Sequence, residues 1–258
     1  LLNTITGDRV TLGQLAVDAV GSGALSYIDP DARNLSTLYN AIEVSLEQSA
    51  SEPTFEDVRY SSMLPDAMMN VMTEIFVASP NGFRGLSLYE SASLDARFAT
   101  QHAGLAANAR NLGARRTHNE HTLNILLGGL TDYDGNGRGL NPGTRLGLLP
   151  ILERIDDAIG TVADSPDAPF SVQVEAELVR VCLENVRVWS GMVIDYEQSM
   201  LLSDSFAATE SDAPASITYA DMLITGTDEN LNEIIEPFEG ECGLEQVKTF
   251  GLVVASFD

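Results

Sequence analysis

The longest regular pattern of apolar positions in the chain lies between residues 170 and 202. Its apolar residues recur at steps of three and four, which is the period of an α-helix. They form two adjacent rows, one of Val174, Leu178, Val181, Val188 and Met192, the other of Val179, Cys182, Val186, Trp189, Val193, Tyr196 and Met200. Only Asn185 breaks the first row. The pattern therefore predicts one long helix from Phe170 to Leu202 with neighbours on several sides.

Shorter helical patterns stand on both sides of this segment. Before it, they predict helices over 11–20, 30–48, 66–78, 87–130 with a break near Gly113, and 144–159 with Thr144 as its cap and a kink at Pro150. After it, they predict short helices over 219–224 and 229–235. The final run, 250–257, is consistent with either a strand or a docked end.

Alternation typical of strands is scarce before residue 203, so the sequence predicts an all-α fold. We expect a helical bundle of about seven to nine helices, because long helices are joined by short breaks. From residue 203 onward the chain carries 12 acidic residues and one basic residue. We therefore expect two parts: a bundle domain over 1–202, and an acidic, less regular C-terminal segment over 203–258 packed on it.

The charge of the chain narrows its range of partners. The formal net charge is −24, and Lys248 is the only lysine among 14 basic residues. A surface of this kind repels nucleic acids and anionic membranes and attracts cations, divalent ones most. The chain also has no run of about 18 apolar residues, so no membrane span is expected.

The two cysteines, Cys182 and Cys242, stand 60 residues apart, and no CxxC motif is present. They are either a disulfide or two buried thiols. We favour the disulfide, because it would attach the acidic C-terminal segment to the long helix. A structural disulfide implies an oxidising compartment, so we expect an exported protein, whether periplasmic, cell-surface or secreted.

The clearest chemical pattern is the stretch 132–140, which has side-chain oxygens at alternate positions. Asp132, Asp134 and Asn136 supply them, and Gly137 follows where the backbone must turn sharply. This stretch resembles the first half of an EF-hand or dockerin-type calcium loop. The resemblance, which covers about nine residues, implies that calcium binds these three side chains and the backbone carbonyl of Arg138.

Two positions depart from the pattern of that family. Gly139 stands where an EF-hand has an apolar β-branched residue, and Gly143 stands where it has a bidentate glutamate. The resemblance therefore implies a partial site that water or a distant carboxylate completes. The alternative is a solvated turn, since Asp, Asn and Gly are also good turn residues.

All three histidines of the chain, His102, His118 and His121, lie within 20 residues. His118 and His121 share one helical face with Glu120 between them in sequence, which makes an alternative metal site of His118, Glu120 and His121. The other reading is that they are surface or capping histidines. Arg115 and Arg116 beside them suggest a small cationic island that could receive a carboxylate from a neighbouring subunit.

No pattern in the chain indicates an enzyme. A G-x-S-x-G elbow and a phosphate-binding loop are both absent from the sequence, and paired carboxylates carry little information in so acidic a chain. We expect an exported helical protein with a structural calcium loop that works through protein contacts, as a partner or a subunit of an assembly. The alternative is a metal-binding or metal-carrying periplasmic protein that uses the His118 and His121 region.

Overall fold

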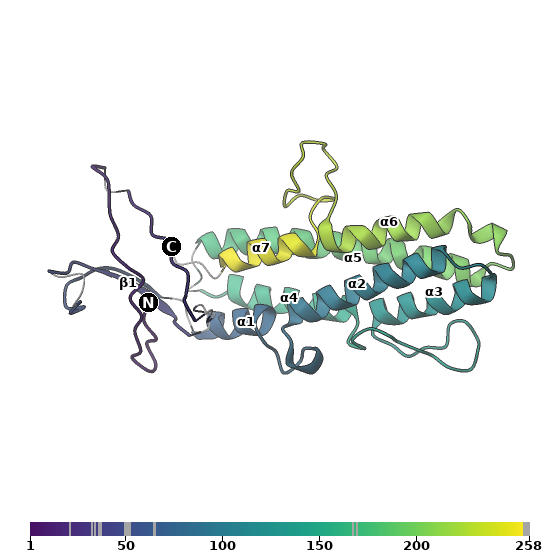
Figure 1. Ribbon diagram of the computed structural model, residues 1–258, viewed down its shortest axis with the longest axis horizontal. Helices are drawn as coiled ribbons and strands as arrows, with labels where there is room; N and C mark the ends of the chain where they lie inside the picture. The colour runs from purple at the N-terminus through teal and green to yellow at the C-terminus, as the bar shows by residue number, and fades with distance from the viewer. Residues whose placement is uncertain are drawn as a thin grey trace. The chain divides into compact units, whose positions relative to one another are not determined.

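A computed structural model of the 258-residue chain shows a mostly helical protein (Figure 1). The structure describes all residues except 21, 32, 34, 36–37, 49–52, 64–65, 167, 169 and 255–258, and also leaves out the side chains of 66, 67, 171 and 252–254. Contacts divide the described part of the chain into two compact units, one within Leu1–Met72 and one within Thr73–Val254. The sequence-based division at residue 202 stays a prediction.

The first unit contains a two-stranded antiparallel sheet. Strand β1, Ala41–Ser45, pairs with β2, Val58–Met63, so that Ala41 faces Met63, and the register shifts between Val44 and Ser45. The helices predicted over 11–20 and 30–48 are wrong for the described residues there. In the first of these segments the apolar residues are not buried, since Val17 and Val20 are 59% and 85% exposed; in the second, Ala41–Ser45 forms a strand instead.

Helix α1, Asp66–Phe76, begins where the sequence predicts a helix and crosses from the first unit into the second. The second unit then consists of helices joined by loops and short 3₁₀ turns. Its helices are α2 Leu88–Ala107, α3 Leu112–Leu127, α4 Leu148–Ala163, α5 Phe170–Leu202, α6 Asp212–Thr225 and α7 Leu244–Val254, with 3₁₀ turns η2 at Phe83–Gly85 and η3 at Ala207–Thr209. The all-α prediction is confirmed, with seven α-helices among the described residues.

Four of these helices form a closed ring of neighbours (Figure 1). Helix α2 packs on α3, α3 on α5, α5 on α6, and α6 back on α2, while α4 contacts both α2 and α5 and α7 contacts α5. Small side chains on α2 allow this close approach: Ala92, Ala96, Ala99, Ala103 and Ala106 are all buried. The start of α2 is held by a capping box between Ser87 and Glu90.

The long helix α5 has the bounds that its apolar pattern predicts. The row from Val179 to Met200 is largely buried, as expected. The other row is only partly so, because Val174 and Val188 are exposed, Val188 at 54%. The two adjacent apolar rows thus correctly predicted a helix. They overestimated the width of its buried face, because part of one row is exposed.

The remaining helices differ from the predictions mainly at their ends. Helix α4 starts at Leu148, not at Thr144, and Pro150 lies in its first turn, where a missing N–H removes no helical hydrogen bond and no kink is required. The predicted piece over 219–224 is part of α6. The predicted helix over 229–235 is wrong, since this stretch is a loop. The final run is helical as far as Val254, in α7, and its last residues lie outside the described part.

Among the described residues, none of the helices combines the length and the apolar character that crossing a bilayer requires.

Candidate functional site

Helix α3 carries an unusual number of buried polar side chains. They are Arg115, Asn119, Glu120, His121, Thr122 and Asn124. A buried polar group is costly unless it is hydrogen-bonded, so each of these side chains needs a partner. Most of the partners lie in the loop that follows α3, on α2, in η3 and on α5, and the Thr122 hydroxyl donates to the carbonyl of His118 in α3 itself.

The loop after α3 turns its backbone N–H groups toward its own side-chain oxygens. Asp132 accepts the N–H of Asn136 on Oδ1 (3.0 Å) and the N–H of Gly137 on Oδ2 (2.7 Å). Asp134 Oδ1 accepts the N–H of Asn136 (3.0 Å), and Asn136 Oδ1 accepts the N–H of Arg138 (2.9 Å). A carboxylate offers about four lone pairs, so the oxygens at alternate positions keep capacity for a cation.

Glu120 of α3 closes this loop from outside. Its buried carboxylate accepts the N–H groups of Tyr133 (2.9 Å), Asp134 (3.2 Å) and Leu140 (2.9 Å). Oxygens of Glu120, Asp132 and Asp134 lie within 4.8 Å of one another. Ligands on opposite sides of a calcium ion, each about 2.4 Å away, lie at such a separation. The distant carboxylate that the sequence could not identify is therefore best assigned to Glu120.

The two departures from the EF-hand pattern have local causes. A Cβ on Gly139 would lie 2.0 Å from the carbonyl oxygen of Leu130, and a Cβ on Gly143 would lie 2.5 Å from Oδ1 of Asp95. That aspartate, buried on α2, also accepts the N–H (2.7 Å) and the hydroxyl (2.6 Å) of Thr144. Burial raises the pKa of Asp95 despite these bonds. Both glycines are thus required where the loop folds back on itself and on α2.

A second loop of the same kind joins α6 to α7. Asp228, Asn230 and Asn232 place side-chain oxygens at alternate positions. Asp228 accepts the N–H of Asn232 on Oδ1 (3.1 Å) and the N–H of Glu233 on Oδ2 (2.7 Å). Asn230 Oδ1 also accepts the N–H of Asn232 (3.1 Å), and Asn232 Oδ1 accepts the N–H of Ile234 (2.9 Å). Bond for bond, this is the pattern of the first loop.

The match extends to the backbone and to the closing carboxylate. Gly135 and Gly137 have φ of 73° and 88°, and Leu231 and Glu233 at the corresponding positions have φ of 61° and 68°. This left-handed region is unfavourable for residues other than glycine. The buried Glu241 accepts the N–H of Asn230 (3.3 Å) and of Glu236 (3.1 Å), as Glu120 does at the first loop.

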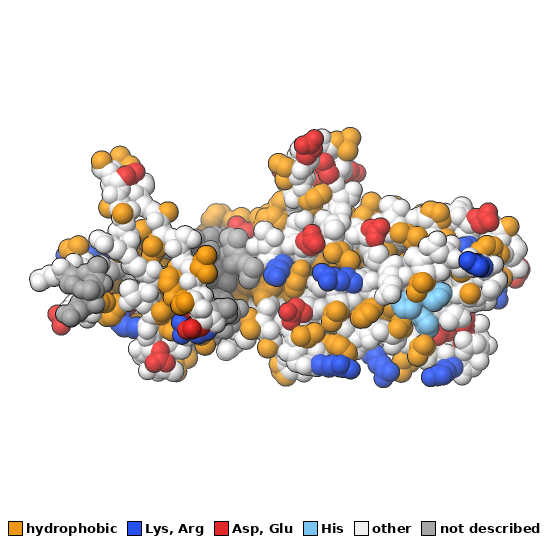
Figure 2. Space-filling view, in the orientation of Figure 1, with side chains coloured by type: hydrophobic (Ala, Val, Ile, Leu, Met, Phe, Trp, Pro, Cys, Tyr) orange, Lys and Arg blue, Asp and Glu red, His pale blue; other side chains and the backbone are white. Residues whose placement is uncertain are grey.

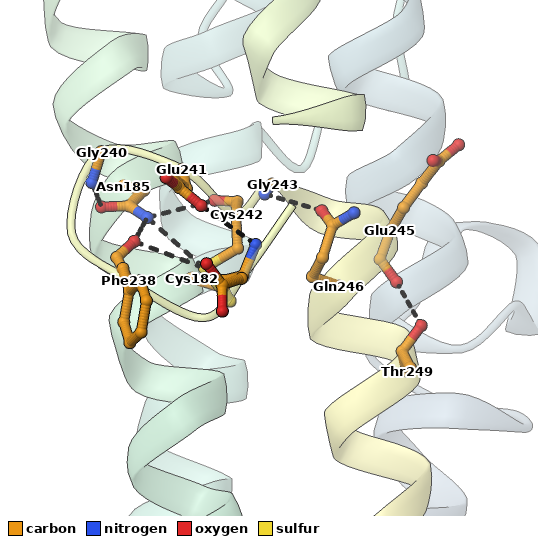
Figure 3. Close-up of a disulfide and its surroundings, with 11 residues drawn as sticks. Cys182, Asn185, Phe238, Gly240, Glu241, Cys242, Gly243, Glu245, Gln246 and Thr249 are labelled. Atoms are coloured by element: carbon orange, nitrogen blue, oxygen red, sulfur yellow. Dashed lines mark hydrogen bonds between the residues drawn. A yellow bond between two sulfur atoms is a disulfide. The ribbon is translucent and has the colours of Figure 1, made fainter. Parts of the chain in front are cut away.

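The base of the second loop is attached to α5 (Figure 3). A disulfide joins Cys182 of α5 to Cys242, with 5.0 Å between their Cα atoms. One turn further along α5, Asn185 donates to the carbonyls of Phe238 (2.8 Å) and Cys242 (3.3 Å) and accepts the N–H of Gly240 (2.8 Å). The disulfide prediction is confirmed, and the polar residue that broke the apolar row of α5 holds this loop.

The sequence contained a signal for the second loop, namely the alternation of Asp228, Asn230 and Asn232. We missed it because the stretch has no glycine: Leu231 and Glu233 stand where the first loop has Gly135 and Gly137. Spaced apolar residues then favoured a short helix instead. Only the folded structure shows that a left-handed backbone is imposed at both positions.

The three histidines meet between α2 and α3. Nδ1 of His102 lies 3.2 Å from Nδ1 of His118 and 3.3 Å from Nδ1 of His121. The structure thus brings His102, not Glu120, to His118 and His121, because Glu120 points toward the loop. Burial lowers the pKa of all three, and the other two rings add to this for His102, whose pKa falls to about 4. The imidazoles are therefore neutral near pH 7.

The predicted cationic island at Arg115 and Arg116 is wrong for Arg115. Arg115 is only 3% exposed; it donates to the carbonyls of Ala106 (2.9 Å) and Ala107 (3.1 Å) and to the Thr209 hydroxyl. Arg116 donates to the carbonyl of Ser203 (2.7 Å). These side chains bind the protein's own backbone, so Arg115 is not available to a neighbouring subunit.

A buried carboxylate, Glu197 of α5, lies next to this arginine in the core. It accepts the hydroxyl of Ser216 (2.6 Å), and Asn119, with its amide nitrogen turned toward Glu197, donates to Oε2 (2.8 Å). Burial raises the pKa of Glu197 to about 8, against the opposing effects of the Ser216 hydrogen bond and the Arg115 charge. Glu197 is thus largely protonated at neutral pH.

No family model, curated protein or solved structure matches this chain. The chemistry of the sites is therefore the basis for a function. The two loops offer oxygen ligands only, which suit a hard cation such as calcium, whereas the three histidines offer nitrogen ligands, which suit a transition metal.

Proposed function

We propose that this protein binds calcium at two matched loops, 132–140 and 228–236, and acts through protein contacts as an exported helical protein. The observation that carries the calcium proposal is the repeated hydrogen-bond pattern. Two loops of different sequence adopt it, one of them with left-handed backbone at two residues other than glycine. A shared ligand is a physical reason for two such loops, since the conformation costs free energy without one.

The role of bound calcium would be to fix connections between helices. The first loop joins α3 to α4 and the second joins α6 to α7, so each ion would hold two helices at a set angle. Net charge also favours this role, because each ion removes part of the repulsion among carboxylates in a chain of charge −24. Export is consistent with the disulfide, because such bonds persist in oxidising compartments.

The calcium proposal predicts two sites that can be removed one at a time. At a calcium concentration about 100-fold above the dissociation constant, each site should add about 2.7 kcal/mol to the free energy of unfolding. Asp132→Ala/Asp134→Ala should remove one site and Asp228→Ala/Asn230→Ala the other, each leaving the helices formed. Calorimetric titration with Ca²⁺, together with thermal melts, measures both effects.

The matched control is Asp195→Ala/Asp204→Ala, which removes the same charge as the first variant from exposed positions outside the loops. It should bind two calcium ions as the wild type does. If the wild type gives neither heat nor a shift in melting temperature at millimolar Ca²⁺, both loops are turns only, and the protein is an acidic helical interaction protein without a calcium site.

The second loop also supports the protein-contact part of the proposal. It exposes three large apolar side chains, Leu231 at 83%, Ile234 at 60% and Phe238 at 55%. Apolar side chains concentrated on one projecting loop are typical of an interaction surface. Such a surface would be ordered by the calcium ion beneath it, which would make the contact dependent on calcium.

For a second copy of the chain as partner, we expect self-association in calcium that is reversed by chelation. Leu231→Ser/Ile234→Ser should reduce it at least tenfold, because both side chains would lose their burial at the contact. Sedimentation velocity over a range of protein concentrations measures this. A chain that stays monomeric with and without calcium would exclude a second copy as the partner.

A further inference from the structure

We propose that His102, His118 and His121 form a three-nitrogen site for a transition-metal ion such as Zn²⁺. The three imidazoles come from two helices of the bundle, one from α2 and two from α3. They are the only histidines in the chain, and all three converge at one point. This site uses different atoms from the calcium loops and does not depend on them.

The spacing of the nitrogens matches a tetrahedral ion. Nitrogen ligands about 2.0–2.1 Å from zinc at tetrahedral angles lie about 3.3 Å from one another. The Nδ1 atom of His102 lies 3.2 Å from that of His118 and 3.3 Å from that of His121. One atom from each ring lies within 4.8 Å of the other two, so a small shift of one ring completes the set.

Hydrogen bonding alone accounts poorly for this arrangement. A neutral imidazole nitrogen either donates one hydrogen or accepts with one lone pair, so Nδ1 of His102 can satisfy only one of its two neighbours. Among the described residues, the three Nδ1 atoms have no hydrogen-bonding partners other than one another. A cation shared by three lone pairs would satisfy all of them at once.

The site is open to solvent on one side. His121 is buried, while His102 and His118 are half-buried, and Figure 2 shows histidine side chains gathered in a single patch at the molecular surface. Three protein ligands with an open fourth position are typical of zinc sites that bind water or a small anion. The rigidity of α2 and α3 would hold the three ligands in place as the fourth changes.

The test is calorimetric titration of the protein with ZnCl₂ in buffer that contains excess Ca²⁺, which occupies any oxygen-only site. We expect one Zn²⁺ per chain, and more than a tenfold loss of affinity in His102→Gln, since loss of an outer-shell partner alone costs about 10–100-fold. Gln101→Ala, an exposed neighbour on α2, is the matched control and should bind as the wild type does. Melting curves establish that both variants are folded.

A second measurement requires no variant. Zn²⁺ should shift the imidazole NMR signals of all three histidines together, with saturation at one equivalent. Zinc binding that leaves these signals unchanged, or that is equal in His102→Gln and wild type, would assign the ion to surface carboxylates and overturn the proposal. Absence of any binding heat together with unchanged signals would overturn it as well.

Discussion

Loss of the Cys182–Cys242 bridge is expected to lower the free energy of unfolding by about 4 kcal/mol. The bridge closes a loop of 60 residues, and on the chain-entropy model such a cross-link restricts the unfolded chain by about this amount. Urea denaturation of the wild type and of Cys182→Ser/Cys242→Ser measures the difference. Since single native domains have total stabilities of about 5–15 kcal/mol, the effect is a large fraction of the whole.

Reductant provides the control for this prediction. It should destabilise the wild type to the level of the double variant and leave the double variant unchanged. Loss of the disulfide should also destabilise the second loop, because Glu241, whose carboxylate accepts N–H groups of that loop, is adjacent to Cys242. Calcium affinity at that loop should therefore fall while the first loop keeps its own. A mass measurement that found two free thiols in the unreduced protein would contradict the prediction, because there would then be no disulfide to lose.

Glu197 is expected to make the protein less stable as pH rises from about 5 to 8. Its pKa is raised to about 8 in the folded state, whereas an unfolded glutamate has a pKa of about 4.3. Between pH values of about 4.3 and 8 the folded chain holds a proton on Glu197 that the unfolded chain has lost. The contribution of Glu197 to the free energy of unfolding is therefore complete below the unfolded pKa and is lost as pH rises toward the folded pKa. The slope is about 1.4 kcal/mol per pH unit, for a total of roughly 4 kcal/mol.

The comparison that isolates this group is Glu197→Gln, which is neutral at every pH. Urea denaturation at pH 5 should give nearly equal free energies of unfolding for the variant and the wild type. As pH rises from 5 to 9, the free energy of unfolding of the variant should increasingly exceed that of the wild type. Glu153→Gln, at an exposed position of α4, is the matched control and should run parallel to the wild type. If the free energy of unfolding of Glu197→Gln also ran parallel to that of the wild type from pH 5 to 9, Glu197 would be ionised over that whole range because of Arg115.

The apolar pattern was sufficient for the long helices but not for the N-terminal part. From Phe170 to Leu202 the pattern runs over nine turns, so its period is unambiguous, and the helix has the predicted bounds. In 30–48 a few apolar residues at helical spacing were also compatible with a strand. Pairing of Ala41–Ser45 with Val58–Met63, a contact distant in sequence, decided between them.

The first loop could be identified from the sequence because its glycines mark the positions where the backbone turns. Its closing residue could not be, since Glu120 lies 12 residues before Asp132 and reaches the loop only because α3 and the loop fold against each other. The second loop was not identified from the sequence, because no glycine marks its turns. Its turns fall on Leu231 and Glu233, whose left-handed backbone is unfavourable for residues other than glycine, so the local sequence did not indicate a turn there.

The sequence by itself determined the helical class, the long helix and its bounds, the first loop and the pairing of the cysteines. These follow from local periodicity, local turn chemistry and the small number of cysteines, which one stretch of chain or a count can reveal. Only the tertiary structure decided which carboxylates close the loops, that Arg115 is buried, and that His102 joins His118 and His121. Each of these depends on which faces of α2, α3 and α5 meet, because side-chain contacts across helices are set by packing and not by nearness in sequence.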